Sequence, residues 1–368
     1  MRTSSEFFPL LLLLVFAIDS SAQDQIPYQT YLCYKTSTPI VIDGKLGDTA
    51  WQEVEWSNKF IDIEGDKKPT PRFETRVKMR WDDSCFYIAA QLQETCVWAT
   101  LTEHDAVIFH DNDFEVFMDP DGDNWEYGEL ELNALNTTWD LFLPKPYRDD
   151  GHADNSWEIT GLKTAVAIQG SLNQSSDTDN GWTVEIAMPW KGLDKIAHTE
   201  NAPNEGLQWH INFSRVEWLT DIVDGKYKKV EGKAEDNWVW SPQGAINMHM
   251  PEKWGIVQFS ALPVGYDKFK LPEYDDIHSF MHTVYYAEKA YYEQNKAWTN
   301  RIDLLMRSYP ELQKCTKNLR SLHADEHGFR AEYDERLRAG LGVATIDNES
   351  HFRFGYSFDY QDKMYENR

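Results

Sequence analysis

The amino-acid sequence predicts a mainly β protein: an antiparallel, jelly-roll-like β-sandwich followed by a small C-terminal α+β extension. About ten short segments alternate apolar and polar residues with the period of two that a half-buried strand requires. Turn residues separate these segments, and helical periodicity appears only after residue 274. Many short strands without intervening helices are typical of sandwiches and barrels.

The stretch from Asp111 to Asp140 shows this pattern most clearly. Residues 113–118 alternate, turn residues fill positions 119–124, and alternation resumes over residues 129–133. The sequence therefore predicts two strands joined by an acidic turn.

The other expected elements follow in chain order. Residues 98–111 and 236–244 are interpreted as loops, and residues 189–193 as a short helical turn. The remaining predicted strands are residues 39–42, 76–81, 86–92, 139–143, 162–168, 181–188, 207–218 and 254–259.

The pattern changes after residue 262. Residues 263–273 are interpreted as a linker, and apolar residues at a spacing near 3.6 predict a helix over 275–298. Further helices are expected over 301–307 and 311–322, and strands over 329–333 and 343–354, the latter turning at 347–350. Residues 263–368 therefore form the predicted extension. A protein partner that binds through this extension is one of the interactions considered.

The first 22 residues are typical of a secretory signal peptide. A short apolar core over residues 7–18 leads to Ser20-Ser21-Ala22, with small residues at the cleavage positions. The core is too short to span a bilayer, so we expect a secreted or periplasmic protein without membrane insertion. The sandwich is then assigned to residues 23–262.

The formal net charge of −25 restricts the partners of this chain. Like-charge repulsion argues against nucleic acid and anionic membrane surfaces. Divalent cations and neutral ligands such as sugars fit this charge.

The chain has four cysteines: Cys33, Cys85, Cys96 and Cys315. In an exported protein they allow three pairings, and free buried thiols are the alternative. Cys85 and Cys96 flank one predicted strand, which would hold them roughly 35 Å apart, so that pair is the least expected.

The acidic turn is the candidate metal site. Asp119, Asp121 and Asp123 offer alternating carboxylates around Gly122. Hard oxygen ligands at this spacing suit calcium, for which a stabilising role is expected; a solvated acidic hairpin is the alternative.

Six short motifs in order resemble the family 9 carbohydrate-binding modules, from about Lys35 to Ser260. The motifs are Ile42-Asp43-Gly44 with Trp51, residues 81–90, residues 112–123, residues 181–190, residues 212–216 and residues 251–255. The resemblance implies a β-sandwich related to DOMON folds, bound calcium, attachment to cellulose or hemicellulose, and a place beside glycoside hydrolases.

The resemblance also implies where a sugar would bind. Family members hold a terminal sugar between two tryptophan rings, whose positions are taken here by Phe109 and Met248. Glu115 corresponds to the family's strand glutamate, and Glu131 stands where the family has an arginine. The candidate carbohydrate-binding residues are Phe109, His110, Glu115, Asn133, Trp238, Trp240 and Met248.

No catalytic signature is evident, so no catalytic residue is assigned. Acidic pairs are too numerous in this chain to indicate a glycosidase. The expected function is non-catalytic binding of a polysaccharide or oligosaccharide in carbohydrate catabolism. The expected polysaccharide is of plant or algal type. The alternatives are an accessory part of a glycoside hydrolase system and haem-dependent electron transfer near Met248, His249 and Met250; haem is the less expected cofactor.

Overall fold

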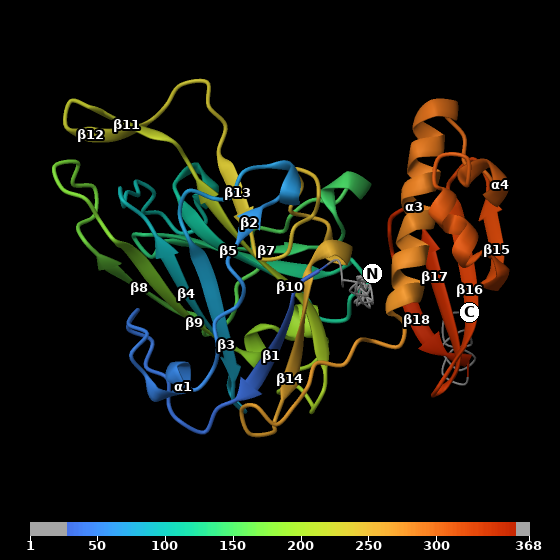
Figure 1. Ribbon diagram of the computed structural model, residues 1–368, viewed down its shortest axis with the longest axis horizontal. Helices are drawn as coiled ribbons and strands as arrows, with labels where there is room; N and C mark the ends of the chain where they lie inside the picture. The colour runs from blue at the N-terminus through green and yellow to red at the C-terminus, as the bar shows by residue number, and fades with distance from the viewer. Residues whose placement is uncertain (1–27, 358–368) are drawn as a thin grey trace, which may run out of the picture.

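A computed structural model describes residues 28–357 of the chain, and the predicted signal peptide lies outside this range. The described chain is mainly β and forms a large curled sheet with a smaller C-terminal extension beside it, as Figure 1 shows. The predicted fold class is confirmed.

Within residues 28–357, twelve strands form the large sheet. They are β1 (Thr30–Lys35), β2 (Ile61–Asp62), β3 (Thr75–Trp81), β4 (Cys85–Gln93), β5 (Asp113–Asp119), β6 (Tyr127–Asn133), β7 (Thr138–Leu143), β8 (Lys163–Gln169), β9 (Gly181–Pro189), β10 (Gln208–Glu217), β13 (Asp236–Val239) and β14 (Gly255–Ser260). β11 (Thr220–Val223) and β12 (Lys226–Lys229) form a separate hairpin.

The strand order is β7-β6-β5-β10-β14-β1-β3-β4-β9-β8, with β13 pairing with β10 and β2. Apolar residues from both halves of this order, including Phe114 and Val116 on β5 and Ile88 on β4, share one core. The sheet therefore curls so that its halves face each other as in a sandwich.

β1 departs from the predicted antiparallel arrangement. It pairs in parallel with β14 on one side and with β3 on the other, and so joins the two halves. Parallel neighbours need a long crossover connection, and the segment between Lys35 and Thr75 supplies the one to β3.

Several predicted elements are wrong in detail. Residues 39–42 form no strand, and Val41 is exposed, so its apolar run is not buried in a sheet. The expected loop 236–244 begins with β13. The expected helix 311–322 is replaced by two 3₁₀ turns and the start of β15 (Leu319–Ala324).

Short helical segments connect the strands of the large sheet. They are α1 (Thr49–Gln52), α2 (Asp194–Ala197), η1 (Gly65–Lys67), η2 (Ile108–His110), η3 (Tyr147–Asp149), η4 (Trp190–Gly192) and η5 (Pro251–Lys253). η2 and η3 lie in the loops that border the candidate site.

The extension has a core of its own. Helix α3 (Asp275–Asn295) packs Phe280 and Met281 against the sheet formed by β15, β16 (Phe329–Leu337), β17 (Gly340–Asp347) and β18 (Arg353–Tyr356). α4 (Ile302–Leu305), η6 (Pro310–Lys314) and η7 (Thr316–Asn318) connect the helix to the sheet.

The other side of α3 contacts the large lobe. Asp149, which is buried, accepts hydrogen bonds from Tyr285 on α3 and from Ser350, and pairs with Lys289 at 2.7 Å. α3 is therefore buried on two sides, with His278, His282 and Glu288 among its buried residues.

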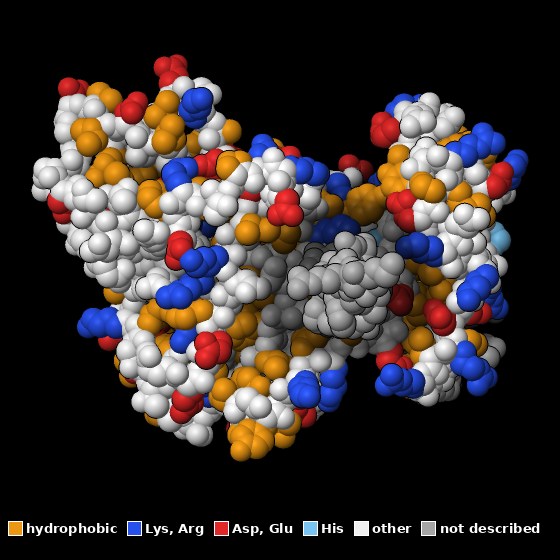
Figure 2. Space-filling model, in the orientation of Figure 1, with side chains coloured by type: hydrophobic (Ala, Val, Ile, Leu, Met, Phe, Trp, Pro, Cys, Tyr) orange, Lys and Arg blue, Asp and Glu red, His pale blue; other side chains and the backbone are white. Residues whose placement is uncertain are grey.

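In the part of the chain that the structure describes, all four cysteines are free, in agreement with the alternative of free thiols rather than with any of the three pairings. No helix within residues 28–357 is long and apolar enough to cross a membrane. Figure 2 shows acidic and basic side chains interspersed over the face that it displays.

Candidate functional site

The candidate site lies on the face of β5, β6 and β7 that points away from the shared core. Period-two alternation directs Phe114 and Val116 inward, and Glu115 and Phe117 to the opposite face. Strand register then forms two rows across the three strands: Glu115–Glu131–Trp139 and Phe117–Glu129–Leu141.

Loops and neighbouring strands complete a pocket of about 230 Å³ over these rows. The side chains that border the pocket from outside the three strands are Phe109 of η2, Tyr147 of η3, Val216, Glu235, Asn237, Met248 and His249. Phe109 and Trp139 stack at a ring-centroid distance of 6.5 Å and an interplanar angle of 29°. The pocket therefore joins aromatic walls to a polar floor.

The floor is unusually acidic for a buried surface. Glu115, Glu129 and Glu131 are all buried, and one oxygen from each of Asp113, Glu115 and Glu131 lies within 4.8 Å of the others. Among the described residues, no Lys or Arg borders the pocket. Burial raises the pKa of Glu115 to about 7. Burial and the charge of Glu115 raise the pKa of Glu129 and of Glu131 well above the ordinary range.

His249 forms one end of the pocket. Its ring meets Tyr147 edge-on at 4.5 Å, and its Nδ1 lies 3.0 Å from the Tyr127 hydroxyl. Burial and the charge of Arg148 lower the pKa of His249 to about 3, so the ring is neutral near pH 7. Its Nε2 lies 4.0 Å from Oε2 of Glu129, an atom without a hydrogen-bond partner among the described residues.

Three of the seven residues predicted to bind carbohydrate meet in this pocket: Phe109, Glu115 and Met248. Glu131, which stands at the family's arginine position, lies there with them. His110 is exposed, and its ring contacts Phe109 rather than bordering the pocket.

Asn133 lies outside the pocket and has a different role. Its side chain is fully buried, accepts the N–H groups of Leu135 and Thr137, and donates to the carbonyl of Leu101 and to Asp111. These bonds use its amide to close the β6–β7 turn, so the group is not free to bind a sugar.

Trp238 and Trp240, which the sequence analysis names as candidate carbohydrate-binding residues, belong to the core. Trp238 is 3% exposed and packs against Phe73 and Arg215, and Trp240 is 1% exposed and packs against Phe213. Neither ring offers a face to a ligand, which corrects that expectation. Trp238 lies on β13 and Trp240 directly follows it, and both rings belong to the shared core, a direction that a loop assignment for 236–244 does not specify.

Sequence reasoning missed Trp139, Glu129 and Tyr147 as pocket residues. The signal for the first two was present in the alternation, because Glu129 and Trp139 share a face with Glu115 once the strands are paired in register. No local pattern pointed to Tyr147, which reaches the pocket from η3.

The acidic turn lies at the end of β5, where the chain turns into β6. One oxygen from each of Asp119, Asp121 and Asp123 lies within 4.8 Å of the others. Asp119 accepts the N–H groups of Gly122 and Asn124 at 3.0 Å each. Burial and the charges of Asp121 and Asp123 raise the pKa of Asp119 well above its ordinary range. The three predicted metal ligands therefore converge.

Comparison with known protein families identifies the class of protein. Residues 42–257 match the model of the carbohydrate family 9 binding domain-like family, which is more than half of the chain. The chain belongs to this family.

Among solved structures, the chain is similar to a family 9 carbohydrate-binding module from Caldicellulosiruptor kristjanssonii, solved with cellotriose. The identity is 15%, the match covers 66% of this chain and 100% of the other, and the TM-score is 0.43. The same module solved with glucose matches at 16% identity over 64% of this chain and 100% of the other, with a TM-score of 0.42. No curated protein matches the chain.

Proposed function

We propose that this chain is a secreted, non-catalytic carbohydrate-binding protein whose pocket over β5–β7 holds a saccharide. The observation that supports this most is the convergence of Phe109, Glu115, Glu131 and Met248 in one pocket. These four positions correspond to the sugar clamp of the family, although three of them carry different residue types. The biological setting would be the breakdown of plant- or algal-type polysaccharide beside glycoside hydrolases, with residues 263–368 available to a protein partner.

The chemistry of the pocket favours a sugar without negative charge. Aromatic rings at Phe109 and Trp139 offer apolar surface to a pyranose face, and the carboxyl groups below accept hydrogen bonds from hydroxyls. A uronic acid would add a carboxylate to a floor that already holds Glu115, Glu129 and Glu131, with no lysine or arginine among the described residues at its border. We therefore expect neutral gluco- or xylo-oligosaccharides to bind and polyuronates not to bind.

Isothermal titration of the full chain with cello-, xylo- and galacturono-oligosaccharides tests this function. Trp139→Ala should weaken neutral-sugar binding at least tenfold, because stacking area at the pocket wall is lost. Trp56→Ala is the matched control, since Trp56 is also half-buried but borders a separate hollow near Arg76.

Each outcome of this titration is informative. Binding lost in Trp56→Ala and kept in Trp139→Ala would move the sugar to the hollow beside Trp56 and overturn the proposed pocket. Absence of binding to every glycan, with the protein folded by circular dichroism, would reject the function itself.

A further inference from the structure

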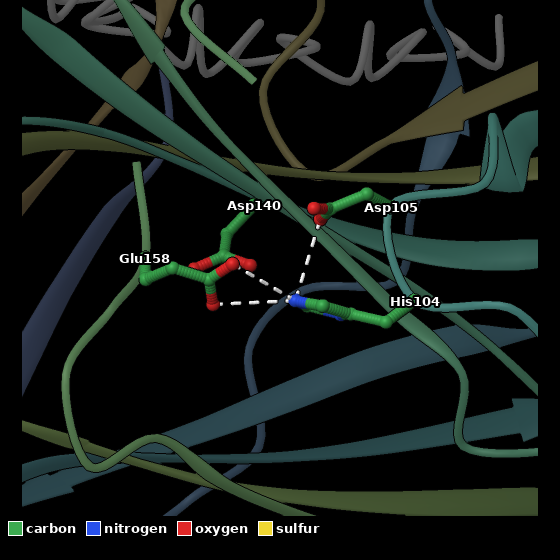
Figure 3. A group of neighbouring side chains, drawn as sticks. All are labelled: His104, Asp105, Asp140 and Glu158. Carbon is green, nitrogen blue, oxygen red and sulfur yellow. Dashed lines mark hydrogen bonds and ion pairs between the residues drawn. The ribbon is translucent and has the colours of Figure 1, made fainter. Parts of the chain in front are cut away.

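A second group of chemically reactive side chains lies at the β7 end of the large sheet, apart from the pocket. His104 and Asp105 come from the loop after β4, Asp140 from β7, and Glu158 from the segment between β7 and β8. Figure 3 shows the four side chains pointing toward one another from these three segments. No motif in the sequence singled them out, because they are distributed over more than fifty residues.

The distances within this group match those between ligands of one metal ion. His104 Nε2 lies 3.1 Å and 3.2 Å from the two carboxylate oxygens of Glu158 and 3.4 Å from Oδ1 of Asp105. One ligand atom from each of the four residues lies within 4.8 Å of the others. Tetrahedral ligands about 2.0–2.1 Å from a zinc ion are roughly 3.3 Å apart, so small movements would suffice.

The orientation of the histidine favours coordination through Nε2. His104 Nδ1 lies 3.0 Å from the carbonyl oxygen of Thr138, to which it donates its hydrogen. The backbone N–H of Asp105 donates to the same oxygen at 3.1 Å and ties the loop to β7. A histidine that ligates through one nitrogen is commonly fixed by such a bond at the other. Nε2 is thus directed at the carboxylates.

Asp140 provides an independent indication of a missing ligand. It is 1% exposed, and its Oδ2 accepts the backbone N–H of Ile159 at 2.5 Å. Its Oδ1 is buried and has no hydrogen-bond partner among residues 28–357. Oδ1 of Asp105 is also buried without a hydrogen bond there and has only its ion pair with His104. A buried carboxylate oxygen without a partner is costly, whereas a bound cation would satisfy it.

A protonated His104 explains only part of this arrangement. Burial lowers the pKa of His104, but the hydrogen bond to Glu158 and the charge of Asp105 outweigh this effect and raise it. The imidazolium would then pair with Glu158, yet among the described residues no hydrogen bond or ion pair joins it to Asp140. Within residues 28–357, Asp105 and Glu158 form ion pairs with His104 alone, and Asp140 forms none. Three carboxylates facing one histidine leave a negative charge that a divalent ion would balance.

We propose that His104, Asp105, Asp140 and Glu158 form a binding site for a divalent transition-metal ion, for which zinc is the probe. Imidazole nitrogen suits zinc and its neighbours, whereas calcium prefers six to eight oxygen ligands. The ion would join the loop that carries Phe109 to the segment that carries Glu158, and both would be held against β7. The site would therefore stabilise one border of the carbohydrate pocket without touching the sugar.

The test is titration of the chelator-treated full chain with Zn²⁺ and, separately, with Ca²⁺. His104→Gln and Asp140→Asn should each weaken the tight zinc site at least tenfold. His198→Gln should not, although His198 is also an exposed histidine facing two acids, Asp121 and Glu126, at 3.9 Å and 3.5 Å. Glu158→Gln, at an exposed position, covers the case in which Asp140→Asn does not fold.

Cobalt substitution adds a readout that does not depend on stability. Co²⁺ bound to nitrogen and oxygen ligands gives visible absorption bands, which should disappear in His104→Gln and persist in His198→Gln. Zinc affinity unchanged in His104→Gln and Glu158→Gln, or no stoichiometric zinc binding to the wild-type chain, would overturn the proposal. Because this readout needs no saccharide, failure of the carbohydrate function would leave it intact.

Discussion

At the scale of single residues, the buried acids of the pocket are the most consequential feature. Glu115 is buried on β5, and the residue directly opposite it on β6 is another glutamate, Glu131. Like charges directly opposite each other in a sheet are destabilising, and burial increases the cost because water no longer screens them. A ligand whose hydroxyl groups donate hydrogen bonds would relieve part of this cost, which is consistent with the proposed binding role.

The pKa of Glu115 makes a prediction about stability. It is raised from 4.5 to about 7 in the folded protein, so folding takes up a proton between these values. The stabilisation from this proton is fully present below pH 4.5 and is lost as pH rises through 7. The free energy of unfolding of Glu115→Gln should therefore exceed that of wild type at pH 8 by on the order of 2 kcal/mol. Near pH 4.5 the two free energies of unfolding should be equal.

Urea unfolding at several pH values measures this difference. The control is Glu55→Gln, an exposed substitution that should leave the pH profile unchanged. A Glu115→Gln profile parallel to wild type would show that the carboxyl group ionises normally.

At the scale of elements, the β5–β6 hairpin combines a pocket floor on its strands with an acidic turn at its end. Gly122 has a φ of +69°, and an added Cβ would lie 3.1 Å from His210 Nε2, so the turn needs glycine there. Asp123 Oδ2 lies 2.9 Å from His351 Nε2, and Trp125 stacks on the same ring at 4.2 Å. The extension therefore helps to fix the turn.

We expect calcium to bind this turn and stabilise it. Calcium at about one hundred times its dissociation constant adds roughly 2.7 kcal/mol, which corresponds to a rise in Tm of roughly 5 °C. Asp121→Asn should abolish this rise in Tm, because it removes one of the three carboxylate ligands. Asp121 is the most exposed of the three. Asp83→Asn, in the turn between β3 and β4, is the matched control. Equal calcium-dependent shifts in the two variants, measured by scanning calorimetry, would exclude the turn as the site.

At the scale of the whole molecule, Arg148 connects the pocket to the extension. It donates to the carbonyl of His249 at 3.1 Å, to Tyr285 of α3 at 3.2 Å and to Glu252 at 2.9 Å. Glu252 also accepts a hydrogen bond from Tyr286 of α3. The loop that carries Met248 and His249 is thus positioned by contacts that include the extension.

Loss of a buried ion pair at this interface should cost more stability than loss of a half-exposed one. Arg148→Ala leaves Glu252 buried without its charge partner, which should cost about 3–5 kcal/mol. Lys145→Ala breaks a bridge to Glu349 across the same interface, but the pair is half-exposed and should cost less than about 1 kcal/mol. Limited proteolysis would show earlier cleavage after residue 262 in Arg148→Ala alone. Similar losses in both variants would contradict the importance of burial here.

The histidines at the interface predict sensitivity to acid. His278 and His282 on α3 lie in ring contact at 4.2 Å, and His278 meets His210 of β10 at 5.3 Å. Burial, with the nearby charges of Arg148 and Lys253, lowers the pKa of His282 to about 3; Glu252 faces the same cluster and acts in the opposite direction on His278. The contribution of these neutral histidines to the stability of the folded protein is present above pH 6.5 and is lost as pH falls toward 3.

Charging of His282 should cost about 2 kcal/mol at pH 5. His278→Leu should reduce the loss of stability between pH 6.5 and pH 5, because it removes a buried group that would have to take up a proton. The replacement breaks no bond at Nε2 of His278, since this atom has no hydrogen-bond partner among the described residues. His327→Leu, at an exposed position of the extension, is the control. A steeper acid loss in His278→Leu than in wild type would refute this explanation.

The sequence by itself determined the strand class, most strand positions and the acidic turn, because period-two alternation and turn residues are local properties of the chain. Through the family resemblance it also named Phe109, Glu115 and Met248, which the structure brings together in one pocket. Only the tertiary structure decided that β1 joins the two halves in parallel and that Trp238 and Trp240 face the core. It alone brought His104 to Glu158. Register and loop packing join residues far apart in the chain, and no local pattern records which partners they meet.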